Sequence, residues 1–364
     1  MVKHAIATIG SHSALDVSDG AHQEGLESIV VAQRGRENTY LQYYKKRKRG
    51  AKTIGCIDDV ILVNKFSEMV QLPVVSYLQK KNAIFVPNRS FAVYVGYDNI
   101  EKQFAIPIFG NKYLLRAEER TIPNNQYDLL KKAGILTPQK ITEPKKIDRL
   151  VLVKVNEAKR TYERAFFTVS SYEEYIQKSI ALIESGKITE SDLKKATIEE
   201  FVIGAHFNFN FFYSGVHDEL ELLGIDTRRQ TNIDGFLRMP ADIQSEILTH
   251  QQPTTIEVGH IACTIRESLL ESIFEQAEKF VETVQKQYKN GLVGPFALQG
   301  AMVEKDGKEE FTVFDVSFRM PGSPGTRYTP YSHYLFGENI SFGRRIAMEV
   351  KEAEKKKLID AITT

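Results

Sequence analysis

The first third of the chain alternates short apolar runs with segments of helical pattern, and this alternation constrains the fold more than any other feature. The apolar runs have the length of buried strands, whereas residues 14–24 have helical spacing and end at Gly25. A strand–helix–strand rhythm predicts an open parallel sheet, because parallel neighbours must be joined by a crossover connection. The expected strands are residues 4–9, 29–33, 60–63 and 83–86.

Two polar segments follow predicted strands of this sheet. Ser11-His12 comes after the first strand, and Asn88-Arg89-Ser90 comes after the fourth. Ligands of open parallel sheets sit beyond the carboxyl ends of the strands. We therefore expect these two segments to lie beside a ligand.

Composition excludes several classes of protein. The 364 residues are enough for two or three domains, and 42% apolar with 26% charged residues is an ordinary soluble composition. The net charge of +1 gives no general attraction to nucleic acid or to a membrane surface, and we interpret the basic residues 45–49 as a solvated helix end.

The sequence shows no pattern of a membrane span, a signal peptide or a cysteine-based site. No apolar run approaches the ~18 residues of a membrane span, and the first residues lack the pattern of a signal peptide. We therefore expect a cytoplasmic protein. Cys56 and Cys263 are far apart, so neither a disulfide framework nor a zinc site is predicted.

The rest of the chain mixes strands and helices in a different rhythm. In a second region we predict helices at residues 125–133 and 171–185, a strand at 150–155 with a hairpin partner at 164–169, and a strand at 198–203. In a third region we predict strands at 207–213 and 220–223, a polar turn at 228–235, helices at 268–288 and 343–357, and an antiparallel pair, 296–303 with 311–318, across Asp306-Gly307.

Residues 314–332 contain the most informative local pattern. The apolar strand here carries Asp315 and then Arg319, and it opens into a loop with two prolines and two glycines before Arg327. Carboxylates bind hard cations, and Arg forks onto phosphate or carboxylate. A site that handles metal and phosphate fits this pattern, and so does a surface hairpin with a solvated ion pair.

Three further features favour a nucleotide site between the second and third regions. Lys154 lies inside an apolar strand, where a phosphate, a nearby carboxylate or a snorkelling stem would each explain it. The segment Glu199-Glu200-Phe201-Val202 could bind adenine through its backbone and ribose through an acid, although plain structural strands look the same. Gln299 and Asp315 fall on adjacent predicted strands, where two oxygen donors could hold Mg²⁺ against phosphates.

The acceptor of such a reaction would bind to the first region. His12 can hydrogen-bond or shuttle a proton near neutral pH, and it precedes a predicted helix whose amino terminus attracts anions. Ser90 and Asn232 can orient polar ligands. A lone loop histidine is most often merely solvated, and residues 232–235 also read as an ordinary turn.

With these residues assembled, the chain resembles the archaeal formate-dependent ligases of purine biosynthesis, the 5-formaminoimidazole-4-carboxamide ribonucleotide (FAICAR) synthetase family. The resemblance runs nearly end to end. It rests on residues 7–15, 82–84, 90–91, 109–111, 222–226, 232–235, 265–270, 294–296 with Gln299, and 343–347.

The resemblance implies an ATP-grasp architecture with α/β and α+β parts. An open parallel α/β domain would span residues 1–112, a lid subdomain 113–203, and a carboxyl-terminal α+β subdomain 204–364. It implies that ATP and Mg²⁺ or Mn²⁺ activate formate as formyl phosphate, which the 5-amino group of AICAR monophosphate attacks to give FAICAR, ADP and phosphate. It also implies a homo-oligomer, without nucleic-acid or membrane partners.

The resemblance also assigns roles to residues. His12, Ser90 and Asn232 would contact the ribonucleotide, Lys154 the phosphates, Glu199, Glu200, Phe201 and Val202 the adenosine, and Gln299 and Asp315 the metal. Arg319 would be catalytic, and Arg319 and Arg36 are our candidates for the ribonucleotide phosphate. Residues 156–163 would form the lid that keeps water from the acyl phosphate.

The sequence departs from the family pattern in three places. The loop after Lys154 has no glycine, so Lys159 and Arg160 would hold phosphate by side chain instead of backbone N–H groups. Asp315 stands where glutamate is expected, and residues 321–329 differ from the Gly-Gly-Thr-Asn form. Two alternatives follow: an ATP-grasp ligase for another acid or amine, or a non-catalytic nucleotide-binding paralogue.

Overall fold

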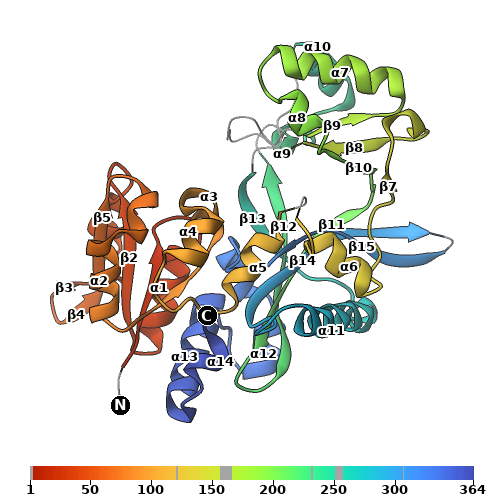
Figure 1. Ribbon diagram of the computed structural model, residues 1–364. Helices are drawn as coiled ribbons and strands as arrows, with labels where there is room; N and C mark the ends of the chain where they lie inside the picture. The colour runs from red at the N-terminus through yellow and green to blue at the C-terminus, as the bar shows by residue number, and fades with distance from the viewer. Residues whose placement is uncertain (1–2, 120–121, 156–165, 231–232, 251–256, 306) are drawn as a thin grey trace.

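The computed structural model describes residues 3–119, 122–155, 166–230, 233–250, 257–305 and 307–364. Figure 1 shows an amino-terminal α/β unit beside a larger β-rich unit, with a small sheet-and-helix unit standing above the latter. None of the helices in these ranges is long and apolar enough to cross a membrane. The division at residues 112 and 203 stays a prediction.

The predicted parallel sheet is confirmed. Its order is β5-β2-β1-β6, and every pair is parallel. Side chains alternate along a strand, so Ala5, Ala7 and Ile9 enter one core while Ile6 enters the core on the opposite face. The elements of this unit are β1 (Ala5–Ile9), α1 (Ala14–Gln23), β2 (Glu27–Gln33), β5 (Asp59–Val63), α2 (Leu72–Lys80), β6 (Ala83–Val86), α3 (Arg89–Val95) and α4 (Tyr97–Lys102).

The basic residues 45–49 are not a helix end, so that interpretation was wrong. They run from the π-helix Thr39–Tyr43 into β3 (Arg47–Arg49), an exposed strand that pairs with β4 (Lys52–Ile54). Lys46 instead makes an ion pair with Asp58 at 2.7 Å.

The last long helix, α13 (Phe342–Lys356), belongs to the amino-terminal unit although it lies at the other end of the chain. It packs against α1, where the red and blue ribbons meet in Figure 1. A Cβ added at Gly20 would lie 2.1 Å from the backbone of Gly343, and one added at Gly343 would lie 2.0 Å from the carbonyl oxygen of Asp16. Glycine at both positions therefore lets the two backbones touch.

The second sheet is small and antiparallel, in the order β7-β10-β8-β9, and the predicted hairpin β8–β9 is confirmed. The Ser171 hydroxyl accepts a hydrogen bond from the backbone amide of Glu174 and so caps the amino terminus of α7. The predicted strand at 198–203 is shorter than expected, because β10 ends at Glu200. The elements are β7 (Lys140–Ile141), β8 (Val151–Lys154), β9 (Phe166–Val169), α7 (Tyr172–Glu184), α8 (Glu190–Leu193) and β10 (Thr197–Glu200).

The third sheet has five antiparallel strands in the order β13-β12-β11-β14-β15. Its apolar face packs on α11 and α6 through a cluster that includes Phe209, Phe296, Phe280 and Leu129. The elements are α5 (Lys112–Ala117), α6 (Gln126–Lys132), β11 (Ala205–Ser214), β12 (Glu219–Gln230), α9 (Ile233–Phe236), α10 (Ala241–His250), β13 (Glu257–Cys263), α11 (Leu270–Gln287), β14 (Gly294–Lys305), β15 (Lys308–Ser317), α12 (Tyr331–Phe336) and α14 (Ile359–Ile362).

One expectation about this sheet was wrong, one strand was not predicted, and one expectation is confirmed. The predicted turn at 228–235 begins too early, because Arg228 and Arg229 continue β12 and pair with β13. Strand β13 itself was not predicted. The antiparallel pair β14–β15 is confirmed, with Gln299 opposite Asp315.

Candidate active site

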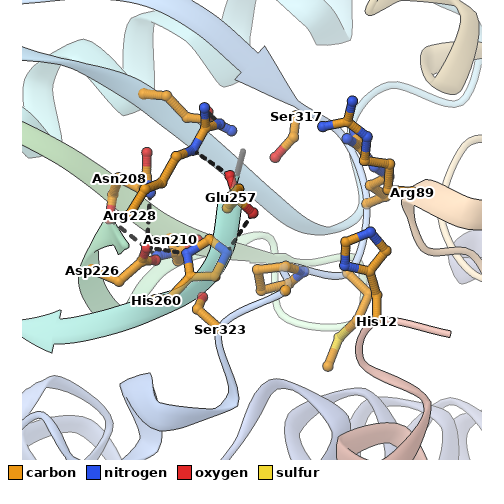
Figure 2. Close-up of a pocket in the computed structure, with 15 residues that line it drawn as sticks. His12, Arg89, Asn208, Asn210, Asp226, Arg228, Glu257, His260, Ser317 and Ser323 are labelled. Atoms are coloured by element: carbon orange, nitrogen blue, oxygen red, sulfur yellow. Dashed lines mark hydrogen bonds and ion pairs between the residues drawn. The ribbon is translucent and has the colours of Figure 1, made fainter. Parts of the chain in front are cut away.

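One pocket lies where the amino-terminal unit meets the five-stranded sheet. His12 and Arg89 line it from the first unit, and side chains of β11, β12, β13 and β14 line the opposite wall. Residues 319–323, in the loop after β15, close it (Figure 2). Polar ends of strands and loops thus converge here, as expected for the carboxyl edge of a parallel sheet.

Four hydrogen bonds hold the converging loops together. The Asn88 side chain donates to the carbonyl oxygens of Ile9, at 3.3 Å, and Ser11, at 2.9 Å. The Met320 amide donates to the Pro87 carbonyl at 3.2 Å, and the Ser13 hydroxyl donates to the Pro321 carbonyl. The loop after β15 is therefore fixed against the first sheet.

A buried carboxylate organises the strand wall of the pocket. Asp226, 1% exposed, accepts hydrogen bonds from the Asn208 amide at 2.8 Å and the Asn210 amide at 2.6 Å. It also accepts a hydrogen bond from His260 Nδ1 at 2.6 Å, and His260 Nε2 lies 3.0 Å from a carboxylate oxygen of Glu257. Burial lowers the pKa of His260, but these two carboxylates outweigh burial and raise it to about 9, so the ring is an imidazolium at neutral pH.

The three arginines of the pocket differ in how they are neutralised. Arg228 makes an ion pair with Glu257 at 3.0 Å, and its guanidinium donates to the side-chain oxygen of Gln299. Arg319 is paired with Glu118, whose pKa is raised by burial despite the opposing charge of Arg319. Arg89 has no ion pair within the described ranges, and burial followed by the charge of Arg319 lowers its pKa.

His12 lines the same pocket as these arginines. Burial first, and then the charges of Arg319 and Arg89, lower the pKa of its imidazole below the ordinary value, so the ring is neutral at pH 7. Its backbone is in the left-handed region, with φ +47°. Non-glycine residues held in that region are uncommon and cluster at functional sites.

Lys154 is the last residue of β8 in the small sheet, and its side chain reaches β15 of the five-stranded sheet. Its ammonium is buried in an ion pair with Glu199, lies 3.2 Å from the Tyr127 hydroxyl, and lies 3.4 Å from the carbonyl oxygen of Phe314. Tyr127 in turn donates to Glu199 at 3.1 Å. The carboxylate partner that we kept as an alternative explanation for this lysine is therefore present.

Gln299 and Asp315 form one potential cation site on the β14–β15 hairpin. Directly opposite residues of an antiparallel pair project to the same face, so both side chains leave the sheet together. The Gln299 oxygen is occupied by Arg228 in this structure. No cluster of three or more His, Cys, Asp or Glu residues in the described ranges could hold a metal, so a cation here would need oxygens from a ligand.

The segment after β10 has the hydrogen-bonding pattern of a strand that leaves its sheet. The Glu200 amide donates to the Gln139 carbonyl at 2.8 Å, and the Phe201 amide donates to the Leu150 carbonyl at 3.1 Å. Phe201 is 38% exposed. The Glu199 side chain is taken by Lys154 and Tyr127, which leaves Glu200 as the more accessible acid.

The remaining predicted residues fall into two groups. Ser90 is 4% exposed, and its hydroxyl donates to that of Ser11 at 2.7 Å, close to His12 in the chain. Asn232, Lys159, Arg160 and the proposed lid at 156–163 lie outside the described residues. The structure thus gathers His12, Gln299 and Arg319 in one pocket and places Lys154 against the strand that carries Asp315.

Sequence reasoning missed the strand wall, and it placed Arg89 beside a ligand without giving this residue a role of its own. Asp226 had appeared only as part of a matching motif, and Arg228 had been placed in a turn. The available signal was the polar pair Asp226 and Arg228, which directly follows the apolar residues 222–225, since side chains two apart share one face of a strand.

Two family models match the chain. One, described as a domain of unknown function (DUF1297), covers residues 174–364, and the other, described as a protein of unknown function (DUF1246), covers residues 6–141. Together they include both walls of the pocket.

Curated relatives match over almost the whole length. A protein of Methanopyrus kandleri named 5-formaminoimidazole-4-carboxamide-1-(beta)-D-ribofuranosyl 5'-monophosphate synthetase is 41% identical over 99% of this chain and 95% of its own length. A protein of the same name from Methanothermobacter thermautotrophicus is 40% identical over 98% of this chain and 94% of its own.

Solved structures agree with the relatives. The crystal structure of an IMP biosynthesis protein, PurP, from Thermococcus kodakaraensis matches 99% of this chain and 100% of its own, with a TM-score of 0.72 and 27% identity. N5-carboxyaminoimidazole synthetase from Staphylococcus aureus matches with a TM-score of 0.56 at 12% identity, covering 93% of this chain and 79% of its own, which shows a shared ATP-grasp fold.

Proposed function

Because the chain belongs to the FAICAR synthetase family, we infer that it uses ATP and formate to formylate the 5-amino group of AICAR monophosphate. It is an ATP-dependent carbon–nitrogen ligase of purine biosynthesis with the ATP-grasp fold. The observation that carries the site assignment is the convergence of His12, Gln299 and Arg319, residues far apart in sequence, in one pocket.

We propose that ATP binds between the small sheet and the five-stranded sheet. Lys154 contacts the phosphates, and its pairing with Glu199 holds the ammonium at a fixed place beside β15. The Val202 amide, which forms no hydrogen bond within the described part of the chain, is free to bind adenine. Glu200 is the better placed acid for the ribose, and Lys159 and Arg160 remain predicted phosphate ligands.

A divalent cation fits the hairpin oxygens. Asp315 supplies a carboxylate and Gln299 an amide oxygen, and Mg²⁺ is ordinarily held by one or two carboxylates together with substrate phosphates. We propose Mg²⁺, or Mn²⁺, at this place. When bound, the ion supplies neutralisation of charge on the transferring phosphoryl group. Arg228 must then release the Gln299 oxygen.

Formate and the acceptor occupy the pocket in this proposal. Formate is a poor electrophile until one of its oxygens becomes the bridge to a phosphate leaving group. Arg319 lies where it can stabilise the charge that develops on that group, with Glu118 fixing the guanidinium. His12 and Ser90 contact the ribonucleotide in this proposal, Ser90 through its hydrogen bond to Ser11, and Asn232 remains a predicted contact.

Arg89 is the structure-based candidate for the ribonucleotide phosphate. Arg319 is already paired with Glu118, and Arg36 is not among the pocket residues. Arg89 lines the pocket beside His12 and lacks an ion pair in the described ranges. A doubly charged phosphate would supply the anionic partner that this guanidinium lacks. We therefore prefer Arg89 to our two earlier candidates.

The function is tested by ADP release from purified protein. We expect ADP only when ATP, a divalent cation, formate and AICAR monophosphate are all present, with FAICAR formed in equal amount. Folded protein that binds ATP but makes no ADP with any of these mixtures would be a nucleotide-binding paralogue. ADP release that another acid supports better than formate would identify a ligase of different specificity. Self-association, expected from the family, is measured on the same sample by light scattering.

A further inference from the structure

We propose that His12 is the general base that takes the proton from the acceptor's amino group during formyl transfer. This inference rests on the proposed function, because it assigns a step of that reaction to a residue for which the family resemblance implies only contact with the ribonucleotide. A general base must offer a lone pair that no other group of the pocket engages.

The carboxylates that line the pocket are already engaged by hydrogen bonds and ion pairs within the protein. Asp226 accepts three hydrogen bonds, from Asn208, Asn210 and His260. Glu257 is shared between Arg228 and His260. Removing either from these contacts would leave a buried cation or buried amides unpaired, which is costly. Neither carboxylate is therefore available to accept a substrate proton.

The remaining cationic groups cannot accept a proton at all. Guanidinium groups are donors only, and an imidazolium such as His260 has no lone pair. The serine hydroxyls of Ser317 and Ser323 are far too weakly basic. Among the described pocket-lining residues, the His12 imidazole thus offers the one ring lone pair that no hydrogen bond engages.

The surroundings of His12 keep that lone pair unprotonated. The charged and titratable groups that act on it are Arg319 and Arg89, which together with burial lower the pKa, His260, which also lowers it, and Glu257, which raises it. A neutral imidazole next to cations is a weak base, so it takes up a proton only from a strongly acidic group. The positively charged nitrogen of a newly acylated amine is such a group.

The position of the ring is also fixed by the backbone. His12 adopts φ +47°, and a Cβ placed at Gly322 would lie 3.3 Å from His12 Nδ1 and 3.5 Å from His260 Nε2. Gly322 therefore lies between the two imidazoles, where a side chain would crowd His12 Nδ1. A strained backbone that is held in place by its surroundings is a feature of functional sites.

Formyl transfer forms one carbon–nitrogen bond and breaks one carbon–oxygen bond. The amine lone pair forms a bond to the formyl carbon, and the carbonyl electrons move to oxygen. A ring nitrogen of His12 takes a proton from the positively charged nitrogen. The tetrahedral centre then collapses, the carbon–oxygen bond to phosphate breaks, and inorganic phosphate leaves with that electron pair. His12 returns its proton to the phosphate or to solvent.

Two half-reactions separate a base from a structural residue. Without acceptor, formate-dependent movement of ¹⁸O between bridging and non-bridging positions of the ATP β-phosphate reports reversible formyl phosphate formation. Rapid-quench measurement with AICAR monophosphate reports formyl transfer. We expect His12→Gln to retain the isotope movement but to lose formyl transfer by about 10²- to 10⁴-fold. The exposed His22→Gln on α1 is the matched control and should change neither.

Chemical rescue provides the second readout. Added imidazole should restore part of the formyl transfer in His12→Ala, because the truncated side chain leaves room for it, and should not affect His22→Gln. Formyl transfer within threefold of wild type in His12→Gln would overturn the proposal, as would parallel loss of isotope movement and transfer without imidazole rescue. A wild-type protein that makes no FAICAR would instead contradict the proposed function itself.

Discussion

Lys154 and Glu199 form a buried ion pair across the antiparallel strands β8 and β10, and the lysine ammonium lies 3.4 Å from the carbonyl oxygen of Phe314, one residue before Asp315. The pair satisfies the lysine within the protein. It also ties the small sheet to the hairpin that carries the proposed metal ligands. A lysine held this way has a structural role, and in our proposal it also binds the triphosphate; the two roles can be separated.

Removing one partner of this pair should destabilise the protein strongly. We expect Lys154→Met or Glu199→Gln alone to lower the free energy of unfolding by about 3–5 kcal/mol, because each leaves a buried group uncompensated. The double variant should recover most of that loss in urea unfolding. Calorimetry should nevertheless show weak ATP binding in Lys154→Met and in the double variant. Normal ATP affinity in the stable double variant would confine Lys154 to a structural role.

Asp315 should be needed for catalysis more than for stability. It is only partly buried, so Asp315→Asn should leave the melting temperature nearly unchanged. Activity should fall by at least about two orders of magnitude if the carboxylate holds the cation. Glu310→Gln, an exposed acid on the same strand, is the control and should behave like wild type. A variant at 315 that melts early yet keeps its turnover would show that Asp315 is structural.

Arg89 should discriminate between phosphorylated and unphosphorylated acceptors. Losing one charge-assisted contact to phosphate should raise the KM for AICAR monophosphate about 10- to 100-fold in Arg89→Gln. The same change should barely affect the corresponding unphosphorylated riboside, tested at high concentration. Arg49→Gln, on the exposed strand β3, serves as the control. If the KM for formate rises instead, the anion that Arg89 binds is formate.

His260 predicts a pH dependence of stability. Its pKa is raised in the folded protein to about 9, so the hydrogen bonds to Asp226 and Glu257 stabilise the fold fully below about pH 6.5, the ordinary histidine pKa. That stabilisation, at most about 3 kcal/mol, is lost as the pH rises through 9. Urea midpoints at pH 6, 8 and 10 should therefore fall more steeply for wild type than for His260→Gln, whereas His22→Gln should follow wild type. Parallel curves for wild type and His260→Gln would mean that the ring is not held as an imidazolium.

Much of the fold was predictable because local patterns and tertiary structure agree. The parallel strands β1, β2 and β6 are apolar and buried on both faces, and such runs are recognisable without knowing their partners. The start of helix α6 is predictable from Asn125, which caps it, and its end is predictable from Gly134. Gln299 and Asp315 were correctly placed as neighbours because the hairpin between them is local in sequence.

The missed parts share a physical reason. Arg228 and His260 lie on strands but point into a polar pocket, so their segments lack the apolar alternation that identifies strands. The packing of α13 on α1 depends on a close approach between two glycines more than 300 residues apart, which no local pattern encodes. Arg89 was expected beside a ligand but received no role, because an arginine without an ion pair is recognisable only once the partners of the other arginines are known.

The fate of the formate oxygens tests the central claim most directly. With formate carrying ¹⁸O at both oxygens, activation through an acyl phosphate requires that one ¹⁸O appear in inorganic phosphate for each FAICAR formed, with the other retained in the formyl group. Mass spectrometry of both products measures this. Phosphate that carries no ¹⁸O while labelled FAICAR accumulates would contradict the account.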